Sequence, residues 1–313
     1  MKILLAGASG AIGLPLLRLL RSAGHAVTAI HRSPSGRDAL LEEGAVPVEV
    51  DALDRSALLA AVRGEHFDAV ISQLSALKKT PLAHKDMVAT NRLRTDGTAN
   101  LLALAEQTGA SRFVTQSMVF GYGYGDFHGR CLTEADPFGP PGHGRFEDHL
   151  AAMRSNEHQV LSAQHVEGIA LRYGLFYGPG PAGDTLVDGL RRRRLPVTAH
   201  GGVQPWVYVD DAAAATVAAL EQGRPGTAYN ITDNEPVSFS QLLTSLAGAL
   251  GAPKPRVLPT WLLAATPYAK TIMTGGLAVS NQLAQRELGW QPQVPTYHEG
   301  IARIADHYSS LAS

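Results

Sequence analysis

The amino-acid sequence predicts an α/β fold, a doubly wound parallel sheet of Rossmann type, from three observations. The chain begins with an apolar run at residues 3–6, which is followed by three regularly spaced glycines and then by leucines at helical spacing. Further short apolar runs alternate with amphipathic stretches through about residue 174. Beyond that residue the alternation is no longer regular, which sets the C-terminal part of the chain apart.

The composition is that of an ordinary globular protein. With 313 residues, 45% of them hydrophobic, the chain can bury a large core, and its net charge of −1 gives no reason to expect a nucleic-acid or membrane partner. The single cysteine, Cys131, excludes an internal disulfide framework and favours a cytoplasmic location. No segment approaches the roughly 18 apolar residues of a membrane span, and no cleavage site follows the start, so we expect a mature N-terminus.

The first strand, turn and helix have the glycine spacing of a dinucleotide-binding unit. Gly7 permits the tight turn, Gly10 allows a pyrophosphate to approach the backbone, and Gly13 lets the helix pack closely on the strand. The first N–H groups of that helix and its positive dipole end favour phosphate binding. We therefore expect the cofactor phosphates to lie over the turn, which consists of Gly7, Ser9, Gly10, Ala11, Ile12 and Gly13.

The end of the second strand, at residues 27–30, predicts which nicotinamide cofactor is bound. An NAD site places an acidic residue there for the ribose 2′-hydroxyl. This sequence has His31 followed by Arg32, and a guanidinium suits the 2′-phosphate of NADP. NADP is therefore the expected cofactor and NAD the second choice, while a solvated arginine is the alternative interpretation of Arg32.

Further strands and helices alternate along the N-terminal half. Strands are expected at residues 46–50, 67–72 and 111–117, and helices at 56–62, 84–108 and 146–164. Parallel strands present ligands at their carboxyl ends, so the residues after the third and fourth strands should contact the cofactor. These are Asp51, Ala52, Leu74, Ser75 and Ala76. Asp54 is placed to cap the helix at 56–62.

The region after the fifth strand holds three candidate catalytic residues. Ser117 ends that strand at the ligand edge of the sheet, where we expect it to hydrogen-bond a substrate oxygen. Tyr122 and Tyr124 follow in a glycine- and proline-rich segment, residues 121–144, that we expect to be a functional loop. Either phenol is close enough in sequence to reach the cleft, and loop packing is the alternative. Later strands are expected at 169–173, 206–211 and 229–231, a helix at 212–220, and three or four helices in the tail.

Together these residues resemble the extended short-chain dehydrogenase/reductase family, also called the NAD-dependent epimerase/dehydratase family. The resemblance covers nearly the whole chain and includes the glycine turn, Asn91 with residues 97–101, and residues 112–117, 171–180, 209–211 and 288–290. It implies a seven-stranded parallel sheet, a smaller C-terminal substrate lobe, and a possible homodimer formed through the two long helices. The cofactor contacts that it adds are Asn91, Gln116, Met153, Tyr173 and Leu175.

The resemblance also implies where the two parts of the chain divide. Residues 1–174 and about 204–232 should form the dinucleotide-binding domain. Residues of about 175–203 and 233–313 should form the substrate lobe, with the cleft for a small-molecule substrate between the two parts.

The family's catalytic Tyr–Lys pair is the clearest departure. These two residues lie four apart on the helix after the fifth strand, with a glutamate four residues further on. Aligned on Glu157, their positions hold His149 and Met153, and no lysine occurs within residues 86–253. A methionine can neither lower a tyrosine pKa nor hold the nicotinamide ribose. We expect His149, with an ordinary pKa of about 6.5, to transfer the proton, unless a tyrosine of residues 121–144 or the substrate does so.

These observations predict an enzyme acting on a small molecule. Residues 203–208 lack the arginine that similar sugar-nucleotide epimerases use for the diphosphate, which makes a nucleotide-sugar substrate less expected, although residues 191–194, all arginines, could supply a substitute. The crowded His143, Glu147, Asp148 and His149 lack the spacing of a metal site, so no metal is expected. We predict an NADP(H)-dependent oxidoreductase or epimerase-like enzyme for a small carbonyl or hydroxyl metabolite. The alternative is a non-redox relative, a lyase, cyclase or NADP(H)-binding sensor, that keeps the cofactor without hydride transfer.

Overall fold

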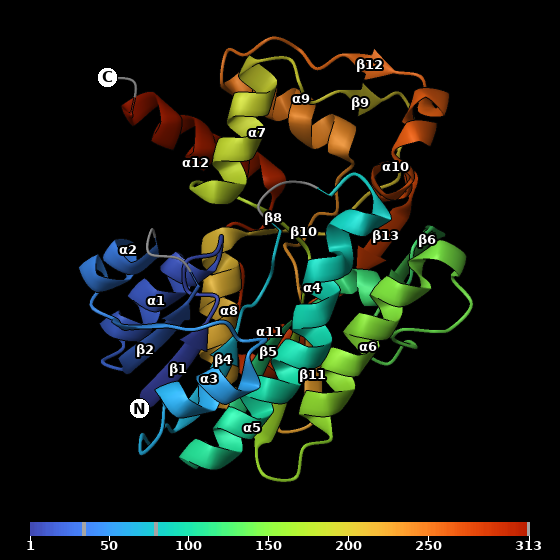
Figure 1. Cartoon of the computed structure of the whole chain (residues 1–313). Helices are drawn as coiled ribbons and strands as arrows, with labels where there is room; N and C mark the ends of the chain where they lie inside the picture. The colour runs from blue at the N-terminus through green and yellow to red at the C-terminus, as the bar shows by residue number, and fades with distance from the viewer. Residues whose placement is uncertain (33–35, 78–80, 312–313) are drawn as a thin grey trace.

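The computed structural model describes residues 1–32, 36–77 and 81–311. Its centre is a seven-stranded parallel sheet with the order β11-β7-β5-β4-β1-β2-β3, so the chain reverses its direction of travel between β1 and β4 (Figure 1). This arrangement confirms the Rossmann-type doubly wound sheet. The strands are β1 Lys2–Ala6, β2 Ala26–His31, β3 Val46–Glu49, β4 Ala69–Ser72, β5 Arg112–Met118, β7 Glu167–Tyr173 and β11 Thr227–Ile231.

Helices cover both faces of this sheet. They are α1 Gly13–Ser22, α2 Arg37–Glu42, α3 Arg55–Ala61, α5 Thr98–Thr108, α6 Glu147–Leu161, α8 Val209–Gln222 and α11 Gln282–Leu288. Successive residues of a strand point to opposite faces, so Ile3 and Leu5 of β1 pack with α1, α8 and α11, whereas Leu4 packs with α3 and α5. Asp54 caps α3 as expected, because its side chain accepts the N–H of Ala57 at 3.0 Å.

The long helix expected at residues 84–108 is continuous, but its winding changes in the middle. The 3-10 turn η2 His84–Met87 leads into α4 Val88–Arg92, and a π-helical turn, η3 Leu93–Gly97, joins α4 to α5. Turns of this kind are frequent at functional sites because they redirect side chains. The periodicity of the sequence predicts the helix but not this turn.

A smaller lobe lies above the sheet in Figure 1 and has its own core, in which Tyr177, Leu190, Leu246 and Ile304 are fully or almost fully buried. Its elements are β8 Leu175–Tyr177, α7 Pro181–Arg191, β9 Val197–Thr198, β10 Trp206–Tyr208, α9 Phe239–Ala249, β12 Val257–Leu258, η6 Thr260–Ala265, α10 Pro267–Thr274, β13 Gly276–Val279 and α12 Tyr297–Ser310. The two parts interleave more than the expected boundaries imply, because α11 returns to pack against α8 and β11.

Two expected elements are wrong in detail. The segment 121–144, expected to be a loop, contains the strand β6 Asp126–Leu132, which pairs in parallel with β13. Most residues of β6 are exposed and its partner lies far along the chain, so the local sequence carries no alternating pattern. The strand expected at 206–211 ends at Tyr208, where α8 begins. Within the described ranges, every helix is too short or too polar to cross a membrane.

Candidate functional site

The glycine turn has the geometry of a phosphate-binding loop. Gly7 has φ +85°, and a Cβ built on it would lie 2.3 Å from the carbonyl oxygen of Gln73. A Cβ on Gly13 would lie 2.3 Å from the Gly7 carbonyl oxygen. Gly10 is different, because it is exposed and its only close contact would be the same Gly7 oxygen at 3.2 Å. Gly7 and Gly13 are therefore required by the protein's own packing, whereas the open side of Gly10 fits an approaching pyrophosphate.

A pocket at the carboxyl ends of β2, β3 and β4 gathers the residues predicted for the adenosine half of the cofactor. Six predicted residues line it, namely His31, Arg32, Asp51, Ala52, Leu74 and Ser75. Ile30, Val50 and Leu93 also line it and were not predicted. Asn100 of α5 donates a hydrogen bond from Nδ2 to the carbonyl oxygen of Ala52 at 2.9 Å, which fixes one wall.

The surroundings of Arg32 suit an additional phosphate. Arg32 is exposed, and no hydrogen bond or ion pair occupies it within the described part of the chain. Gly36 lies beside the glycine turn, since a Cβ built on it would be 3.5 Å from the Cβ of Ser9. Arg37, the exposed first residue of α2, follows at once and is a second cation that the sequence analysis missed. The residues present therefore fit a nicotinamide dinucleotide, and Arg32 lines the adenosine-side pocket.

Other predicted cofactor residues are held by the protein itself. The hydroxyl of Tyr173 is in the core, 2.6 Å from Thr216 Oγ1, and burial raises the pKa of Tyr173 to about 12. Any cofactor contact of Tyr173 must therefore come from its main chain. Leu175 begins β8 and donates its N–H to Pro205 O. Ala76 lies in the loop after β4, where its N–H bonds the hydroxyl of Thr90 at 3.2 Å. Gln116 is half-buried within β5.

His149 lies on the face of α6 that the family alignment predicts. His149, Met153 and Glu157 are 2%, 1% and 4% exposed, so one buried stripe carries all three. His149 Nε2 lies 2.9 Å from Nδ1 of His84, and His149 Nδ1 lies 2.9 Å from Nδ2 of Asn91. An amide nitrogen can only donate, so His149 Nδ1 accepts from Asn91 and the ring proton is on Nε2, which donates to His84. Asn91, predicted to contact the cofactor, therefore orients this imidazole.

The surroundings of His149 overturn the expectation of an ordinary imidazole. Burial, with smaller effects of His84 and Arg94, lowers the pKa of His149 to about 4. The ring is therefore neutral near pH 7, and both of its nitrogens already have partners. Few of these rings therefore carry a proton near neutral pH, unlike the imidazole of ordinary pKa that the sequence alone suggested.

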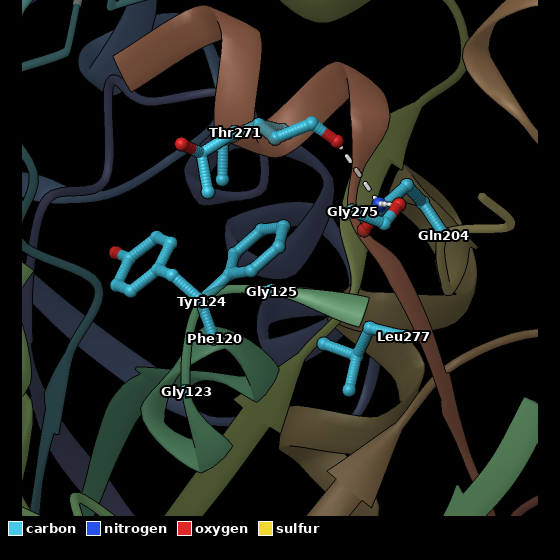
Figure 2. Close-up of a pocket in the computed structure, with 9 residues that line it drawn as sticks. Phe120, Gly123, Tyr124, Gly125, Gln204, Thr271, Gly275 and Leu277 are labelled. Atoms are coloured by element: carbon cyan, nitrogen blue, oxygen red, sulfur yellow. Dashed lines mark hydrogen bonds between the residues drawn. The ribbon is translucent and has the colours of Figure 1, made fainter. Parts of the chain in front are cut away.

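An aromatic cluster surrounds this imidazole. It consists of His84, Tyr124, Phe146, His149 and Tyr268, with centroid separations that include 4.2 Å between Tyr124 and Phe146 and 5.5 Å between His149 and Tyr268. Figure 2 shows Tyr124 beside Phe120 at a small pocket under Thr271 of α10. Burial and the neighbouring Tyr268 hold the pKa of Tyr124 well above its ordinary value, so this phenol keeps its proton. Tyr124 is thus the predicted catalytic residue that does line a pocket.

Arg94 was missed altogether. It lies in the π-helical turn and is 8% exposed, and its Nη1 has no hydrogen-bond partner within the described residues. Burial lowers the pKa of Arg94, against the opposing effects of Tyr124 and Tyr268. An arginine in an amphipathic helical pattern usually faces solvent, so nothing in the sequence indicated this position.

Ser117 and Tyr122 belong to a buried network instead of the cleft. Ser117 Oγ donates to Glu157 Oε1 at 2.6 Å, and Arg172 Nη2 donates to Glu157 Oε2 at 2.7 Å. Arg172 Nη1 donates to the Tyr122 hydroxyl at 2.8 Å, which in turn donates to Asn230 Oδ1 at 2.9 Å. Burial raises the pKa of Tyr122 to about 12. These side chains join β5, α6, β7 and β11, so their expected direct roles in catalysis are not supported by the geometry.

Known proteins agree with this architecture. Residues 3–232 match the NAD dependent epimerase/dehydratase family. A 3-diazoavenalumate denitrifying reductase of a Streptomyces species is 35% identical over 97% of this chain and 100% of the relative. The 2-alkyl-3-oxoalkanoate reductase of Stenotrophomonas maltophilia is 29% identical over 97% of this chain and 98% of the relative.

A solved structure adds a cofactor. The Thermus thermophilus UDP-glucose 4-epimerase in complex with NAD has a TM-score of 0.78 and 26% identity to this chain, and 99% of each chain is covered. Three observations support a nicotinamide cofactor. They are the glycine turn, the pocket lined by the predicted adenosine-side residues, and the similarity to an epimerase that binds NAD. The chain therefore belongs to the NAD dependent epimerase/dehydratase family, within the extended short-chain dehydrogenases/reductases, and is an enzyme of the oxidoreductase and epimerase class.

Proposed function

We propose that this enzyme is an NADP(H)-dependent reductase of a small carbonyl compound or a similarly electrophilic metabolite, and that it works without a Tyr–Lys pair. The proposal is supported by the alignment on Glu157, which puts His149 and Met153 at the positions of that pair, and by the burial of both side chains. With a pKa of about 4, roughly one imidazole in a thousand is charged at pH 7. Near neutral pH, His149 of α6 is therefore almost never protonated. The acceptor must take the hydride with little proton donation from this helix.

Two kinds of acceptor meet this condition. A carbonyl takes a hydride on carbon and a proton on oxygen, and the protonated Tyr124 can hydrogen-bond that oxygen while water supplies the proton. A diazonium carbon takes a hydride while dinitrogen leaves with the electrons of the broken C–N bond, and no proton is consumed. The names of the two curated relatives, a denitrifying reductase of a diazo compound and a reductase of an oxo compound, support reduction as the reaction type.

The preference for NADP(H) rests on the end of β2. His31 occupies the position where a carboxylate would select NAD, and the exposed Arg32 lines the adenosine-side pocket. The exposed Arg37 follows Gly36, which lies beside Ser9 of the glycine turn. One good charged contact is worth about 1.5–3 kcal/mol, so NADP(H) should bind at least tenfold more tightly than NAD(H). Calorimetric titration of both cofactors measures this difference. Arg32→Ala should remove most of it, and equal affinities in the wild type would overturn the cofactor assignment.

Hydride transfer is tested by following the loss of NADPH absorbance with a panel of acceptors. The panel contains an aryl aldehyde, a 3-oxo acid and an aryl diazonium salt, each with and without enzyme. We expect enzyme-dependent oxidation of NADPH with at least one of these acceptors and slower oxidation of NADH. If NADPH binds tightly but is oxidised by none of them, the reductase proposal fails and the non-redox alternative is favoured.

A further inference from the structure

The positive charge of Arg94 has no role in the reaction proposed above. The side chain is more than nine-tenths buried, Nη1 lacks a hydrogen-bond partner, and no carboxylate forms an ion pair with it among the described residues. By contrast, the other buried guanidinium of the fold, Arg172, is fully engaged by Glu157 and Tyr122. An unpaired buried charge is costly, by several kcal/mol, and proteins retain such groups where a ligand completes them.

The position of Arg94 points to the substrate and not to the adenosine half of the cofactor. Its neighbour Leu93 lines the adenosine-side pocket, whereas Arg94 follows about 100° further around the helix. The groups that feel its charge are Tyr124, Tyr268 and His149, which come from three other segments. Tyr268 belongs to α10 of the smaller lobe, so Arg94 lies where the two parts of the molecule meet.

The π-helical turn that carries Arg94 packs against α6, which carries His149, and Tyr124, Tyr268 and His149 all belong to the aromatic cluster. The rings of Tyr124 and Phe146 are 4.2 Å apart, those of Phe146 and Tyr268 5.7 Å, and those of His84 and Phe146 4.7 Å. Most of these ring surfaces are apolar, and none carries a negative charge. A ligand that satisfies both features has an anionic, planar head for the guanidinium and a flat apolar body for the rings.

We propose that Arg94 binds the carboxylate of an aromatic acid, which is the substrate class of this enzyme. The inference deepens the reductase proposal, because it states which electrophiles reach the nicotinamide. A carboxylate matches the planar fork of a guanidinium and would supply the acceptor that Nη1 lacks. A phosphate of the cofactor has the same sign of charge, so the experiment must separate the two sources of anion.

The test compares binding of an acid and its uncharged ester to the enzyme saturated with NADP⁺. The probes are 4-hydroxycinnamate, cinnamate and benzoate, each against its methyl ester, measured by calorimetry. We expect at least one acid to bind tenfold or more tightly than its ester. Arg94→Met should bring that ratio near one while the affinity for NADP⁺ changes less than twofold. Arg92→Met, on the same helix but exposed and paired with Asp96, should behave like the wild type.

Several outcomes would overturn the inference. Equal binding of every acid and its ester by the wild type, or no binding of the acids up to 10 mM, would do so without any variant. A retained acid preference in Arg94→Met, or a large loss of NADP⁺ affinity, would assign Arg94 to another role. The carboxylate site and the reductase activity are tested independently. If acids bind through Arg94 but no acceptor oxidises NADPH, the carboxylate site is supported and the reductase proposal fails. If acidic acceptors are reduced equally well by wild type and Arg94→Met, the reaction stands without the site.

Discussion

The imidazole of His149 illustrates how burial decides the chemistry of a single residue. Its pKa is about 4 in the folded protein, whereas an unfolded histidine titrates near 6.5. Between these values the unfolded chain binds a proton that the folded chain does not, so folding stability falls as the pH is lowered from about 6.5 to 4. Above pH 6.5 the contribution is complete and constant.

This behaviour predicts a pH dependence that a substitution removes. On going from pH 7 to pH 4.5, wild type should lose about 1 kcal/mol more stability than His149→Phe, after allowance for solvent screening. Urea denaturation at both pH values measures the difference. The rate of reduction should also be level between pH 6 and 8, because His149 stays neutral there. A rate that rises tenfold per unit of falling pH would show that the rare imidazolium carries the proton.

The glycines of the first turn predict two contrasting variants. Gly10→Ala adds a methyl group whose one close contact is the Gly7 carbonyl oxygen at 3.2 Å, so a small local shift should retain the fold while NADPH affinity falls at least tenfold. Gly13→Ala is the matched control, because its methyl group would meet two backbone carbonyls at 2.3 Å and should lower the melting temperature by several degrees. Thermal unfolding and NADPH titration separate the two effects. Unchanged NADPH affinity in Gly10→Ala would place the pyrophosphate elsewhere.

At the scale of secondary-structure elements, the Glu157–Arg172 pair joins α6 to β7 and positions the helix that carries His149. Removing one partner of a buried pair leaves an uncompensated charge, so Arg172→Met should cost ~3–5 kcal/mol. The double variant Arg172→Met with Glu157→Gln should recover part of this loss, since neither charge then remains. Chemical denaturation of the three proteins forms the cycle. Equal losses in the single and double variants would show that the pair contributes packing only.

The same elements show what could be predicted from the sequence. The glycine turn, the alternation of strands and helices and the stripe of His149, Met153 and Glu157 depend on local spacing, and the structure reproduces them. The partners of Ser117 and Tyr122 come from α6, β7 and β11, so their buried network depends on contacts between distant segments. The pairing of β6 with β13 and the inward turn of Arg94 depend on such contacts too. For this reason local spacing predicted six residues that line one pocket, whereas the buried network and Arg94 could not be predicted.

For the whole molecule, Asp233 shows how pH acts through a buried carboxyl group of the smaller lobe. It accepts a hydrogen bond from the hydroxyl of Tyr177 at 3.3 Å, and burial raises its pKa to about 8. The unfolded carboxyl loses its proton near pH 4, so stability falls as the pH rises from about 4 to 8. Asp233→Asn does not titrate and should gain stability relative to wild type across this window, by ~2–5 kcal/mol in total. Melting temperatures at pH 5 and 8 test this, and a gap that is constant with pH would contradict it.

The homodimer implied by the family resemblance is also a property of the whole molecule. Of the large hydrophobic side chains described on α4, α5 and α6, Val88 alone is exposed. A dimer formed through these helices would therefore have a largely polar interface and should weaken at high salt. Sedimentation velocity at low and high salt measures this, and a monomer under both conditions would exclude it.

The π-helical turn at Leu93–Gly97 has a consequence for how this site is arranged. A π turn corresponds to one residue inserted into an α-helix, which shifts the angular phase of everything before it by about 100° relative to everything after it. The downstream half keeps Asn100 on the adenosine loop, while the upstream half turns Asn91 and His84 toward His149. One additional residue in the turn therefore sets which side chains of this helix face the cofactor pocket and which face His149. Deleting one residue from the turn should restore the phase and separate His84 from His149 with the cofactor pocket intact.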